Sequence, residues 1–352
     1  MKIKNVIEKK DRPITIAGPC SAESEDQILM TAKALAAQGV DLFRAGVWKP
    51  RTSPGSFEGV GSIGLKWLAR AKAETGIKVT TEVANPHHVI EALRAGIDVL
   101  WIGARTTVSP FAIQEMANVL KGVDIPVLIK NPVNPDLKLW IGAIERIYNA
   151  GIRRIGVIHR GFSFFGNSKY RNVPRWQLPI ELKRQLPEIQ IFIDSSHICG
   201  NTELLFDVAQ KAMDLNYDGL MLEVHPNPSK AFSDAKQQIV PADFEKLVNN
   251  LVIRDLKSEN GIALKHLRQQ IDEIDDELFQ ILAKRLEVVK NIGHYKKNNN
   301  IAILQPKRWN DILEKGFEKA EHLGLSREFI SAYLKAIHQE SINVQEDILK
   351  KR

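Results

Sequence analysis

Eight short apolar segments recur through the first 225 residues of the chain, and each ends in a side chain able to bind a metal or an anion. The segments are continuously apolar and rich in β-branched residues, which is typical of strands buried on both faces of a parallel sheet. They occupy residues 14–20, 41–44, 78–82, 99–105, 127–130, 155–160, 191–197 and 220–223. Helical patterns separate them, for example at 24–38, 62–75, 110–121, 137–150 and 202–213. Successive β-then-α units of this number predict an α/β fold, the (β/α)8 or TIM barrel, whose functional residues gather at the C-terminal strand ends.

Length and composition narrow the functional classes. The 352 residues are enough for a barrel of about 250 residues and one smaller domain. We expect neither a signal peptide nor a membrane-spanning helix, because no apolar run has the length or flanks of either. Two cysteines, Cys20 and Cys199, favour a reducing, cytoplasmic location. The net charge of +7 is scattered along the chain, so we expect anionic small-molecule ligands rather than nucleic acid or a membrane.

The composition changes after the eighth apolar segment. A polar stretch at residues 254–261 ends in glycine and predicts a linker. It would separate a barrel domain, residues 1–253, from a tail, residues 262–352. No strand pattern remains in the tail, so we expect an all-α domain there.

Three helices are predicted in the tail. In the first, apolar residues recur at steps of three and four, which predicts a long amphipathic helix with a packing seam. The apolar seam consists of residues 264, 267, 271, 274, 278, 281, 288 and 292. Breaks at residues 298–300 and at Pro306 lead to a second helix near 307–321. Ser326 is a capping residue at the start of a third helix, which runs to about residue 350.

Cations are concentrated at the predicted C-terminal end of the barrel. Lys49 begins a loop, residues 49–57, in which two prolines and a glycine restrict the backbone. Rigid cations of this kind suit a phosphate or carboxylate, although the loop taken alone is also compatible with a basic surface turn. More cations end strands two, four, five and six, namely Arg44, Arg105, Lys130 and Arg160. Because so many cations would repel one another, we expect bound anions such as phosphorylated sugars or acids.

A second group of side chains has the chemistry of metal ligands. A thiolate, an imidazole and two carboxylates suit a divalent transition metal such as Mn, Fe, Co or Zn better than Mg or Ca. They belong to Cys20, His197, Glu223 and Asp234. Taken singly, Cys20 is more readily interpreted as a small buried apolar residue and His197 as a hydrogen-bonded core residue. Strands one, seven and eight are neighbours in a closed barrel, so we expect these side chains to meet.

Five motifs in the barrel resemble the 3-deoxy-D-arabino-heptulosonate-7-phosphate (DAHP) synthases over about residues 12–250. The resemblance is to the shorter type I subgroup, which is related to 3-deoxy-D-manno-octulosonate-8-phosphate synthase. The motifs are Lys49-Pro-Arg-Thr-Ser-Pro54, Ile102-Gly-Ala-Arg-Thr106, Asp194-Ser-Ser-His197, Met221-Leu-Glu-Val-His225 and Phe232-Ser-Asp-Ala235. The family condenses phosphoenolpyruvate with erythrose 4-phosphate and water and releases phosphate. The resemblance of the Lys-Pro-Arg-Thr sequence implies that the aldose is the four-carbon erythrose 4-phosphate rather than the five-carbon aldose of the octulosonate-forming relatives.

The resemblance implies a role for each candidate residue of the barrel. The metal ligands would be Cys20, His197, Glu223 and Asp234. Phosphoenolpyruvate would be bound by Arg44, Lys49, Arg105, Lys130 and Arg160. The aldose phosphate would be bound by Arg51 and Thr52. We expect Lys49 and Glu82 to handle protons and to place the attacking water.

The tail carries an arginine within its apolar seam. Arg285 occupies a step of the seam where leucine or isoleucine is expected, and a buried arginine must face an anion. Lys296 lies three helical turns further on and about 20° away, hence on the same face. Arg268 is about 100° off that face, so it suits a neighbouring site in a dimer. Ser341 and Gln345 form an i, i+4 pair on the third helix.

This pattern resembles the all-helical chorismate mutases over about residues 262–350. The matching residues are Arg268, Arg285, Lys296, Arg308, Ser341 and Gln345. The resemblance implies that two intertwined protomers build each site, that arginines bind the carboxylates of chorismate, and that Lys296 and Gln345 donate to its ether oxygen. Family members have acidic residues near the arginine at 308, whereas this chain has Gln305 and Trp309. The hydroxyl contact, and hence the strength of the activity, is therefore open.

The sequence supports two functional hypotheses. The first is a bifunctional shikimate-pathway enzyme, a homo-oligomer of at least two chains, in which prephenate binding to the tail inhibits the barrel. The second is a DAHP synthase whose tail only senses chorismate or prephenate and regulates the barrel. A plain dimerising helical hairpin is a third interpretation of the tail, and an arginine in the seam argues against it.

Overall fold

The structure is a computed structural model and describes residues 1–49, 55–254 and 262–350. It separates into two units, Met1–Arg254 and Asp255–Arg352. Of the linker expected at 254–261, only Arg254 lies among the described residues. No helix in the described part of the chain is long and apolar enough to cross a membrane.

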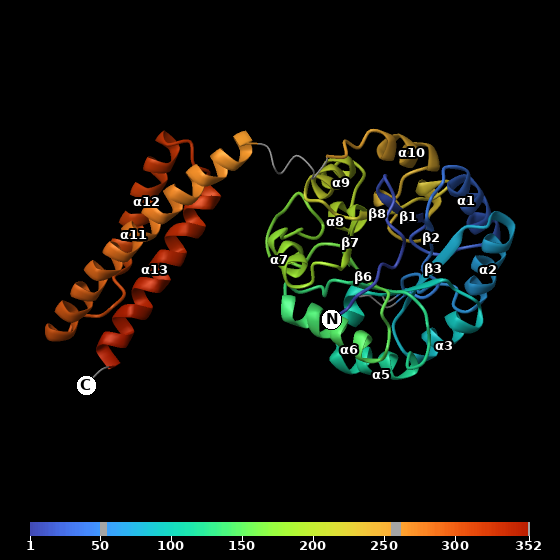
Figure 1. Ribbon diagram of the computed structural model, residues 1–352, viewed down its shortest axis with the longest axis horizontal. Helices are drawn as coiled ribbons and strands as arrows, with labels where there is room; N and C mark the ends of the chain where they lie inside the picture. The colour runs from blue at the N-terminus through green and yellow to red at the C-terminus, as the bar shows by residue number, and fades with distance from the viewer. Residues whose placement is uncertain (50–54, 255–261, 351–352) are drawn as a thin grey trace. The chain divides into compact units, whose positions relative to one another are not determined.

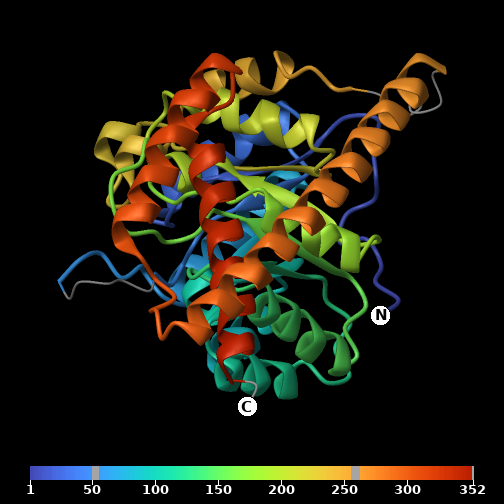
Figure 2. The same cartoon turned by 90° about the vertical axis from the view of Figure 1, so that its left-hand side faces the viewer.

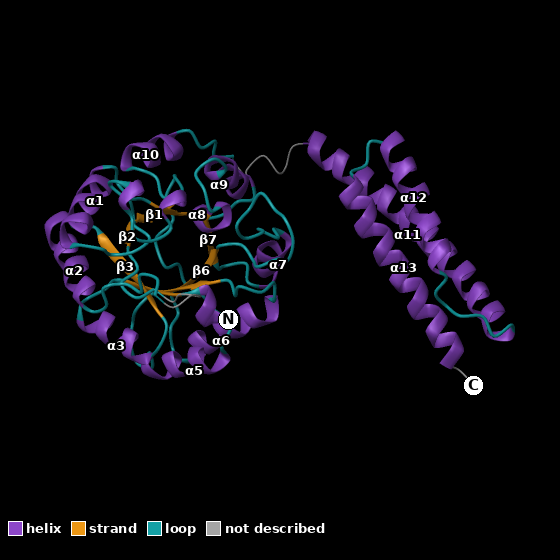
Figure 3. Cartoon of the chain, turned by 180° about the vertical axis from the view of Figure 1, so that it is seen from behind, coloured by secondary structure: helices purple, strands orange, loops and turns teal. Residues whose placement is uncertain are grey.

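Parallel strands form a closed barrel in chain order, and helices surround it (Figures 1 and 3). The strands are β1 Ile14–Gly18, β2 Leu42–Arg44, β3 Lys78–Val83, β4 Val99–Ile102, β5 Val127–Lys130, β6 Ile155–His159, β7 Gln190–Asp194 and β8 Gly219–Glu223. The ring closes between β1 and β8, with Gly18 opposite Glu223. The predicted (β/α)8 barrel is confirmed, because each of the eight apolar segments overlaps one of its strands.

The helices of the barrel unit are α1 Glu25–Ala37, α2 Ile63–Thr75, α3 Pro86–Arg94, α4 Ala104–Thr107, α5 Pro110–Val119, α6 Leu137–Asn149, α7 Gln177–Gln185, α8 Ser195–Cys199, α9 Leu205–Asp214 and α10 Pro241–Asn249, with 3-10 turns η1 Pro228–Lys230 and η2 Ala235–Gln237. Five of them, α1, α2, α5, α6 and α9, begin within three residues of the predicted positions. The short α4 and α8 directly follow β4 and β7. Arg105 and His197, which were expected at strand ends, therefore lie in these short helices.

Apolar side chains fill both sides of the strands. The larger core lies between strands and outer helices and includes the fully buried Trp140. A smaller cluster inside the barrel includes Trp101 and is joined by Val6 from the N-terminal segment. The backbone N–H of Val6 donates to Oε1 of Gln190, at the start of β7, over 2.8 Å. This segment packs at the N-terminal ends of the strands, opposite the C-terminal ends where the functional residues of such barrels lie.

The second unit consists of α11 Ile262–Asn298, α12 Pro306–His322 and α13 Arg327–Lys350 (Figure 2). Helix α11 packs along α13, which also contacts α12. The expected all-α tail of three helices is thus observed. The exposed fractions of Ile271, Ile274 and Ile281 are 57%, 63% and 60%. The unit by itself therefore leaves much of the apolar seam of α11 uncovered.

Candidate active sites

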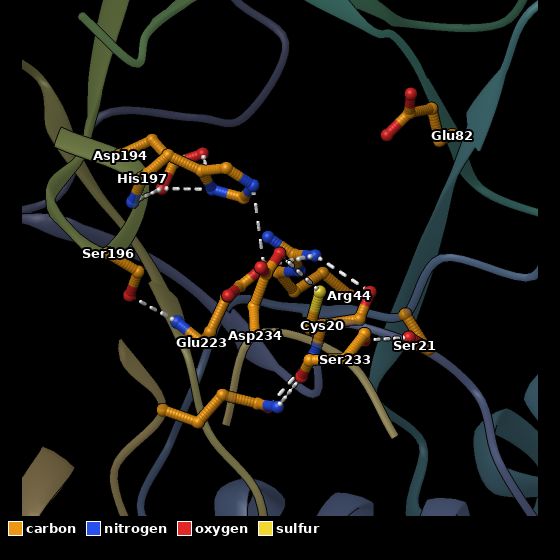
Figure 4. Close-up of polar contacts among 12 residues, drawn as sticks. Cys20, Ser21, Arg44, Glu82, Asp194, Ser196, His197, Glu223, Ser233 and Asp234 are labelled. Carbon is orange, nitrogen blue, oxygen red and sulfur yellow. Dashed lines mark hydrogen bonds and ion pairs between the residues drawn. The ribbon is translucent and has the colours of Figure 1, made fainter. Parts of the chain in front are cut away.

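The four predicted metal ligands of the barrel lie together at the C-terminal strand ends (Figure 4). The ligand atoms of Cys20, Glu223 and Asp234 are all within 4.8 Å of one another. Nε2 of His197 lies 3.7 Å from Oε1 of Glu223. The structure thus brings these residues into one cluster, which we call the ligand cluster.

Strand pairing explains why the cluster forms. Cys20 lies two residues after β1, Glu223 is the last residue of β8, and these two strands are hydrogen-bonded neighbours. His197 follows β7, the other neighbour of β8. Asp234 comes from the loop after β8 and adopts a left-handed backbone with φ of 49°. That conformation is uncommon for a residue with a side chain and costs on the order of 1–3 kcal/mol, so surrounding contacts must hold it.

Three contacts join the loop of Asp234 to the segment after β1. The hydroxyls of Ser21 and Ser233 hydrogen-bond to each other. The backbone N–H of Phe232 donates to Oε1 of Glu23 over 2.8 Å. The backbone N–H of Cys20 donates to Oε1 of Gln238 over 3.0 Å. These bonds hold the two segments that supply the thiol and the second carboxylate in a fixed relation.

The charges of the ligand cluster fit a divalent cation. Burial, and then the nearby Glu223 carboxylate, raises the pKa of the Cys20 thiol to about 12. Oε1 of Glu223 is buried and accepts no hydrogen bond from the described residues. A metal ion would stabilise the thiolate of Cys20 and would bind Oε1 of Glu223, which accepts no hydrogen bond in the described part of the chain. The donor set of sulfur, nitrogen and oxygen therefore suits a divalent transition metal.

Asp194 orients the imidazole of His197. Its Oδ1 lies 3.0 Å from Nδ1 of His197 and also accepts the backbone N–H of His197 over 3.1 Å. Burial lowers the pKa of His197 although Asp194 opposes this shift, so the neutral ring is favoured. A neutral imidazole bonded at Nδ1 leaves Nε2 available as a ligand.

Arg44 is the most deeply buried cation of the site, with 1% of its surface exposed. Its Nη2 lies 3.2 Å from Oε1 of Glu223 and donates to the carbonyl of Cys20 over 3.2 Å. Its Nε and Nη1 are buried without a hydrogen-bond partner among the described residues. Buried guanidinium donors without acceptors are costly, so this position fits an anionic ligand.

Lys130 and Arg160 add two more buried cations. Nζ of Lys130 donates to Oδ2 of Asp194 over 2.8 Å. Nη1 of Arg160 donates to Oδ1 of Asn172 over 2.6 Å. Burial lowers the pKa of Arg160 to about 10, with a further lowering from Arg105. Arg105 itself is exposed on α4. Cations that lower one another's pKa in this way are stabilised by a bound anion.

The two residues expected to handle protons have different partners. Nζ of Lys49 is 3.0 Å from Sγ of Cys20 and 3.0 Å from its carbonyl oxygen. Oε2 of Glu82 accepts the indole N–H of Trp101 over 3.0 Å. A Cβ at Gly103 would lie 2.0 Å from Oε1 of Glu82, so any other residue there would displace this carboxylate. Arg51 and Thr52, expected to bind the aldose phosphate, lie outside the described residues.

A second polar cluster lies between α11 and α13 in the helical unit. Nη1 of Arg285 donates to Oγ of Ser341 over 2.8 Å. Lys296 is 9% exposed, and its Nζ donates to the carbonyl of Ile303 over 2.6 Å. Oε1 of Gln345 is buried without a partner in the described part of the chain. Arg285 was expected to be buried, but in a single chain it is half-buried, because part of the seam beside it is uncovered.

Two predicted residues of the tail do not join this cluster. Arg268 is exposed on α11, and its Cα lies about 25 Å along the continuous helix from that of Arg285. It cannot reach the same site from the same chain. Arg308 is exposed near the start of α12. The next residue, Trp309, stacks on His338 of α13 with ring centroids 4.0 Å apart. Trp309, one of the two positions at which the resemblance implies an acidic residue, is therefore packed against α13.

Several residues that shape the barrel site were not assigned from sequence. Asp194 was quoted within a motif but given no role, although its position three residues before His197 is a signal for a local hydrogen bond. Trp101 lies beneath Arg44, with 5.0 Å between the guanidinium and the ring centroid. Arg171 and Gln237 also contact the carboxylate side of the cluster. No local sequence pattern indicates the last two.

Comparison with known proteins covers both units. Residues 1–255 match the DAHP synthetase I family, and residues 267–346 match chorismate mutase type II. A phospho-2-dehydro-3-deoxyheptonate aldolase of Thermotoga maritima is 32% identical over 250 residues, which cover 71% of this chain and 71% of that protein. A 2-dehydro-3-deoxyphosphooctonate aldolase of Nitratidesulfovibrio vulgaris is 30% identical over 250 residues, which cover 63% of this chain and 85% of that protein.

Solved structures agree with this assignment. The crystal structure of DAHP synthase from Thermotoga maritima superposes with a TM-score of 0.61 at 30% identity, covering 68% of this chain and 67% of that one. A truncated form of the Thermotoga maritima synthase gives a TM-score of 0.60 at 27% identity, covering 70% and 90%. The predicted pairing of two enzyme domains is confirmed. The chain therefore belongs to the DAHP synthetase I family and carries a chorismate mutase type II domain after its barrel.

Proposed function

We propose that the barrel condenses phosphoenolpyruvate with erythrose 4-phosphate and water, forming DAHP and phosphate. The observation that carries this proposal is the contact between a metal-ligand cluster and an anion site. Nη2 of Arg44 lies 3.2 Å from Oε1 of Glu223, while the other guanidinium donors of Arg44 have no acceptor among the described residues. An enol phosphate bound there would lie beside the metal.

Different residues of the barrel would bind the two substrates. Arg44, Lys130 and Arg160, with Lys49 and Arg105, would bind the carboxylate and phosphate of phosphoenolpyruvate. Arg51 and Thr52 would bind the phosphate of the aldose. A divalent transition metal held by the ligand cluster, whether Mn, Fe, Co or Zn, supplies Lewis-acid polarisation of the aldehyde. Lys49 would hold a proton next to the aldehyde oxygen, and Glu82 would place the water that adds to the enolpyruvate.

The two cysteines of the chain provide a matched test of the barrel proposal. Cys20 and Cys199 are both buried, but only Cys20 belongs to the ligand cluster. Chelator treatment should abolish condensation, and Mn, Fe, Co or Zn should restore it. Cys20→Ala should lose condensation with metal added, and Cys199→Ala should retain it. Condensation by Cys20→Ala at the wild-type rate would contradict the assignment of the ligand cluster as the metal site.

The helical unit is proposed to rearrange chorismate to prephenate in a homodimer. Arg285 would bind a substrate carboxylate beside Ser341, and Arg308 from α12 would bind the other. Lys296 and the unpaired amide of Gln345 would donate to the ether oxygen as charge develops there. Because Arg268 cannot reach its own chain's site, the partner subunit's Arg268 would complete it.

The uncovered seam of α11 supports this dimer. Isoleucines with 57–63% of their surface exposed along one helix face are costly to leave in water and suit a second copy of the chain. Ile274→Asp should therefore give a monomer without mutase activity, by light scattering and chorismate turnover. Leu323→Asp changes an apolar residue that is 72% exposed near the end of α12, outside the seam, and should stay dimeric. A dimeric Ile274→Asp protein would contradict the proposed interface.

Prephenate feedback is proposed to couple the two units. Prephenate lies downstream of DAHP, so a mutase domain that binds it is suited to sense the output of the pathway. Prephenate should inhibit condensation by the full chain but not by a chain ended at Ile253. Equal inhibition of both chains, or of neither, would leave the units uncoupled.

The stacking of Trp309 on His338 favours a second candidate function for the helical unit. Trp309 occupies one of the two positions at which the resemblance implies an acidic residue, which would weaken turnover while leaving the carboxylate contacts in place. The unit would then be a sensor of chorismate or prephenate without useful mutase activity. Chorismate turnover by the full chain separates the two: absence of turnover with intact prephenate binding supports the sensor.

A further inference from the structure

One buried amide connects two members of the ligand cluster. Gln237, at the end of η2, is 1% exposed. Its Nε2 donates to Oε2 of Glu223 over 2.7 Å. Its Oε1 accepts a hydrogen bond from Nη1 of Arg171 over 2.7 Å, and the same Nη1 donates to Oδ1 of Asp234 over 3.0 Å. A continuous chain of hydrogen bonds thus runs from one carboxylate of the cluster to the other.

This chain of bonds leaves one oxygen of each carboxylate available. Oε2 of Glu223 is bonded to Gln237, whereas Oε1 accepts no hydrogen bond from the described residues. Oε1 lies 3.2 Å from Nη2 of Arg44, with which it forms an ion pair, and 3.7 Å from Nε2 of His197. Oδ1 of Asp234 is bonded to Arg171, whereas Oδ2 lies 3.4 Å from Sγ of Cys20. The available oxygens are therefore those that face the other ligands.

An amide is well suited to this position. It presents a donor to Glu223 and an acceptor to Arg171, and it adds no charge to a cluster that already holds two carboxylates. A glutamate there would repel Glu223, and an apolar residue would leave Oε2 of Glu223 without the donor of Gln237 and would remove the acceptor that Arg171 uses. Gln237 is also held by its own backbone, because its N–H donates to the carbonyl of Asp234 over 3.1 Å.

We propose that Gln237 is a positioning residue that presets the metal centre. By engaging Oε2 of Glu223 directly, and Oδ1 of Asp234 through Arg171, it assigns one oxygen of each carboxylate to the metal and prevents two-oxygen binding. The inference rests on the proposed metal site in the barrel and adds to it a residue outside the ligand set. Partners that orient ligands in this way typically contribute about 10- to 100-fold in metal affinity.

Cobalt binding to the full-length, metal-stripped chain tests the role of Gln237. Co²⁺ reports affinity by titration, Cys20 ligation by its thiolate charge-transfer absorption, and coordination geometry by its ligand-field bands. Gln237→Met keeps the length of the side chain and removes both hydrogen bonds. It should bind Co²⁺ about 10- to 100-fold more weakly, with changed ligand-field bands but with the thiolate absorption retained.

Gln190→Met is the matched control. Gln190 is also 1% exposed and also uses its amide in buried hydrogen bonds, but these lie at the N-terminal end of the barrel with Val6 and Ile7. It should lose stability without changing Co²⁺ affinity or spectrum. If Gln237→Met fails to fold, Arg171→Met provides the second variant, since the Arg171 side chain is 45% exposed. It removes the bonds to Asp234 and to Oε1 of Gln237 but keeps the bond from Gln237 to Glu223, and it should weaken Co²⁺ binding with altered ligand-field bands.

The outcomes separate this inference from the proposed function. Wild-type protein that shows no thiolate-to-cobalt absorption would overturn both. Wild-type protein that binds Co²⁺ through Cys20, with Gln237→Met or Arg171→Met matching it within threefold in affinity and in spectrum, would overturn the role of Gln237 alone. A parallel loss in Gln190→Met would also overturn it, because general destabilisation would then explain the effect.

Discussion

Nζ of Lys130 donates to Oδ2 of Asp194 over 2.8 Å, and the same carboxylate holds Nδ1 of His197. Asp194 is completely buried, and its pKa lies well below its usual range: burial raises it, but His197 and Lys130 outweigh burial. One carboxylate therefore connects a cation of the anion site to a ligand of the proposed metal. A change at Lys130 should therefore affect His197, and a change at His197 should affect Lys130, through Asp194.

The first prediction concerns the stability of this connection. Asp194→Asn keeps the shape of the side chain but removes the charge that compensates buried Lys130. Breaking a buried pair in this way costs about 3–5 kcal/mol in the free energy of unfolding. Denaturant unfolding measures it, with Asp214→Asn as the control because the Asp214–Arg254 pair is exposed. A loss below about 1 kcal/mol in Asp194→Asn would contradict the prediction, because the pair would then contribute no more than an exposed salt bridge does.

The second prediction concerns Arg44. Arg44→Lys keeps the positive charge but removes the planar set of donors, of which Nε and Nη1 are free of described partners. Charge-assisted hydrogen bonds contribute about 1.5–3 kcal/mol each, so kcat/KM for phosphoenolpyruvate should fall at least tenfold. Arg70→Lys, at an exposed ion pair on α2, should leave it unchanged. If kcat/KM for phosphoenolpyruvate is unchanged in Arg44→Lys, direct binding of the anion by the guanidinium donors of Arg44 is excluded.

The third prediction concerns the helical unit. Lys296→Met keeps most of the apolar stem and removes the ammonium proposed to act on the ether oxygen. Loss of one such donor costs about 3–4 kcal/mol, or about 100- to 1,000-fold in kcat. Lys290→Met is the control on the same helix, because Lys290 is exposed and pairs only with Glu287 among the described residues. Chorismate turnover within tenfold of wild type in Lys296→Met would remove that role.

The fourth prediction is a pH dependence at the other end of the barrel. Burial of Asp41 disfavours its charge, but hydrogen bonds from Lys10, Arg12 and the Thr15 backbone outweigh burial and lower its pKa. A carboxyl with a lowered folded-state pKa stabilises the fold above its unfolded pKa of about 4, and this contribution is lost as the pH falls through the folded-state value. Asp41→Asn should therefore lower Tm most at neutral pH and progressively less below pH about 4. Thermal unfolding at several pH values measures this. A difference in Tm between wild type and Asp41→Asn that does not change with pH would contradict it.

Much of the barrel site follows from the order of the sequence. Cys20, Arg44, Lys130 and Glu223 each lie at or just after the end of an apolar segment. Right-handed β-then-α units place every such end on one face of the ring, so convergence needs no knowledge of side-chain contacts. The helical periods of the tail likewise predict α11 and place Arg285 and Lys296 on one face.

The tertiary structure alone decides which atoms of these residues are free to act. Gln237 and Arg171 are 66 positions apart, and Lys130 and Asp194 are 64 apart, so no local pattern indicates that they touch. The bond from Gln237 occupies one oxygen of Glu223, the bond to Asp194 occupies one nitrogen of His197, and two donors of Arg44 are left without a described partner. The half-burial of Arg285 has the same origin, since it depends on what covers α11. Strand and helix periods are properties of neighbouring residues, whereas the hydrogen-bond partner of a buried group depends on which distant segments the fold brings within 3 Å or so.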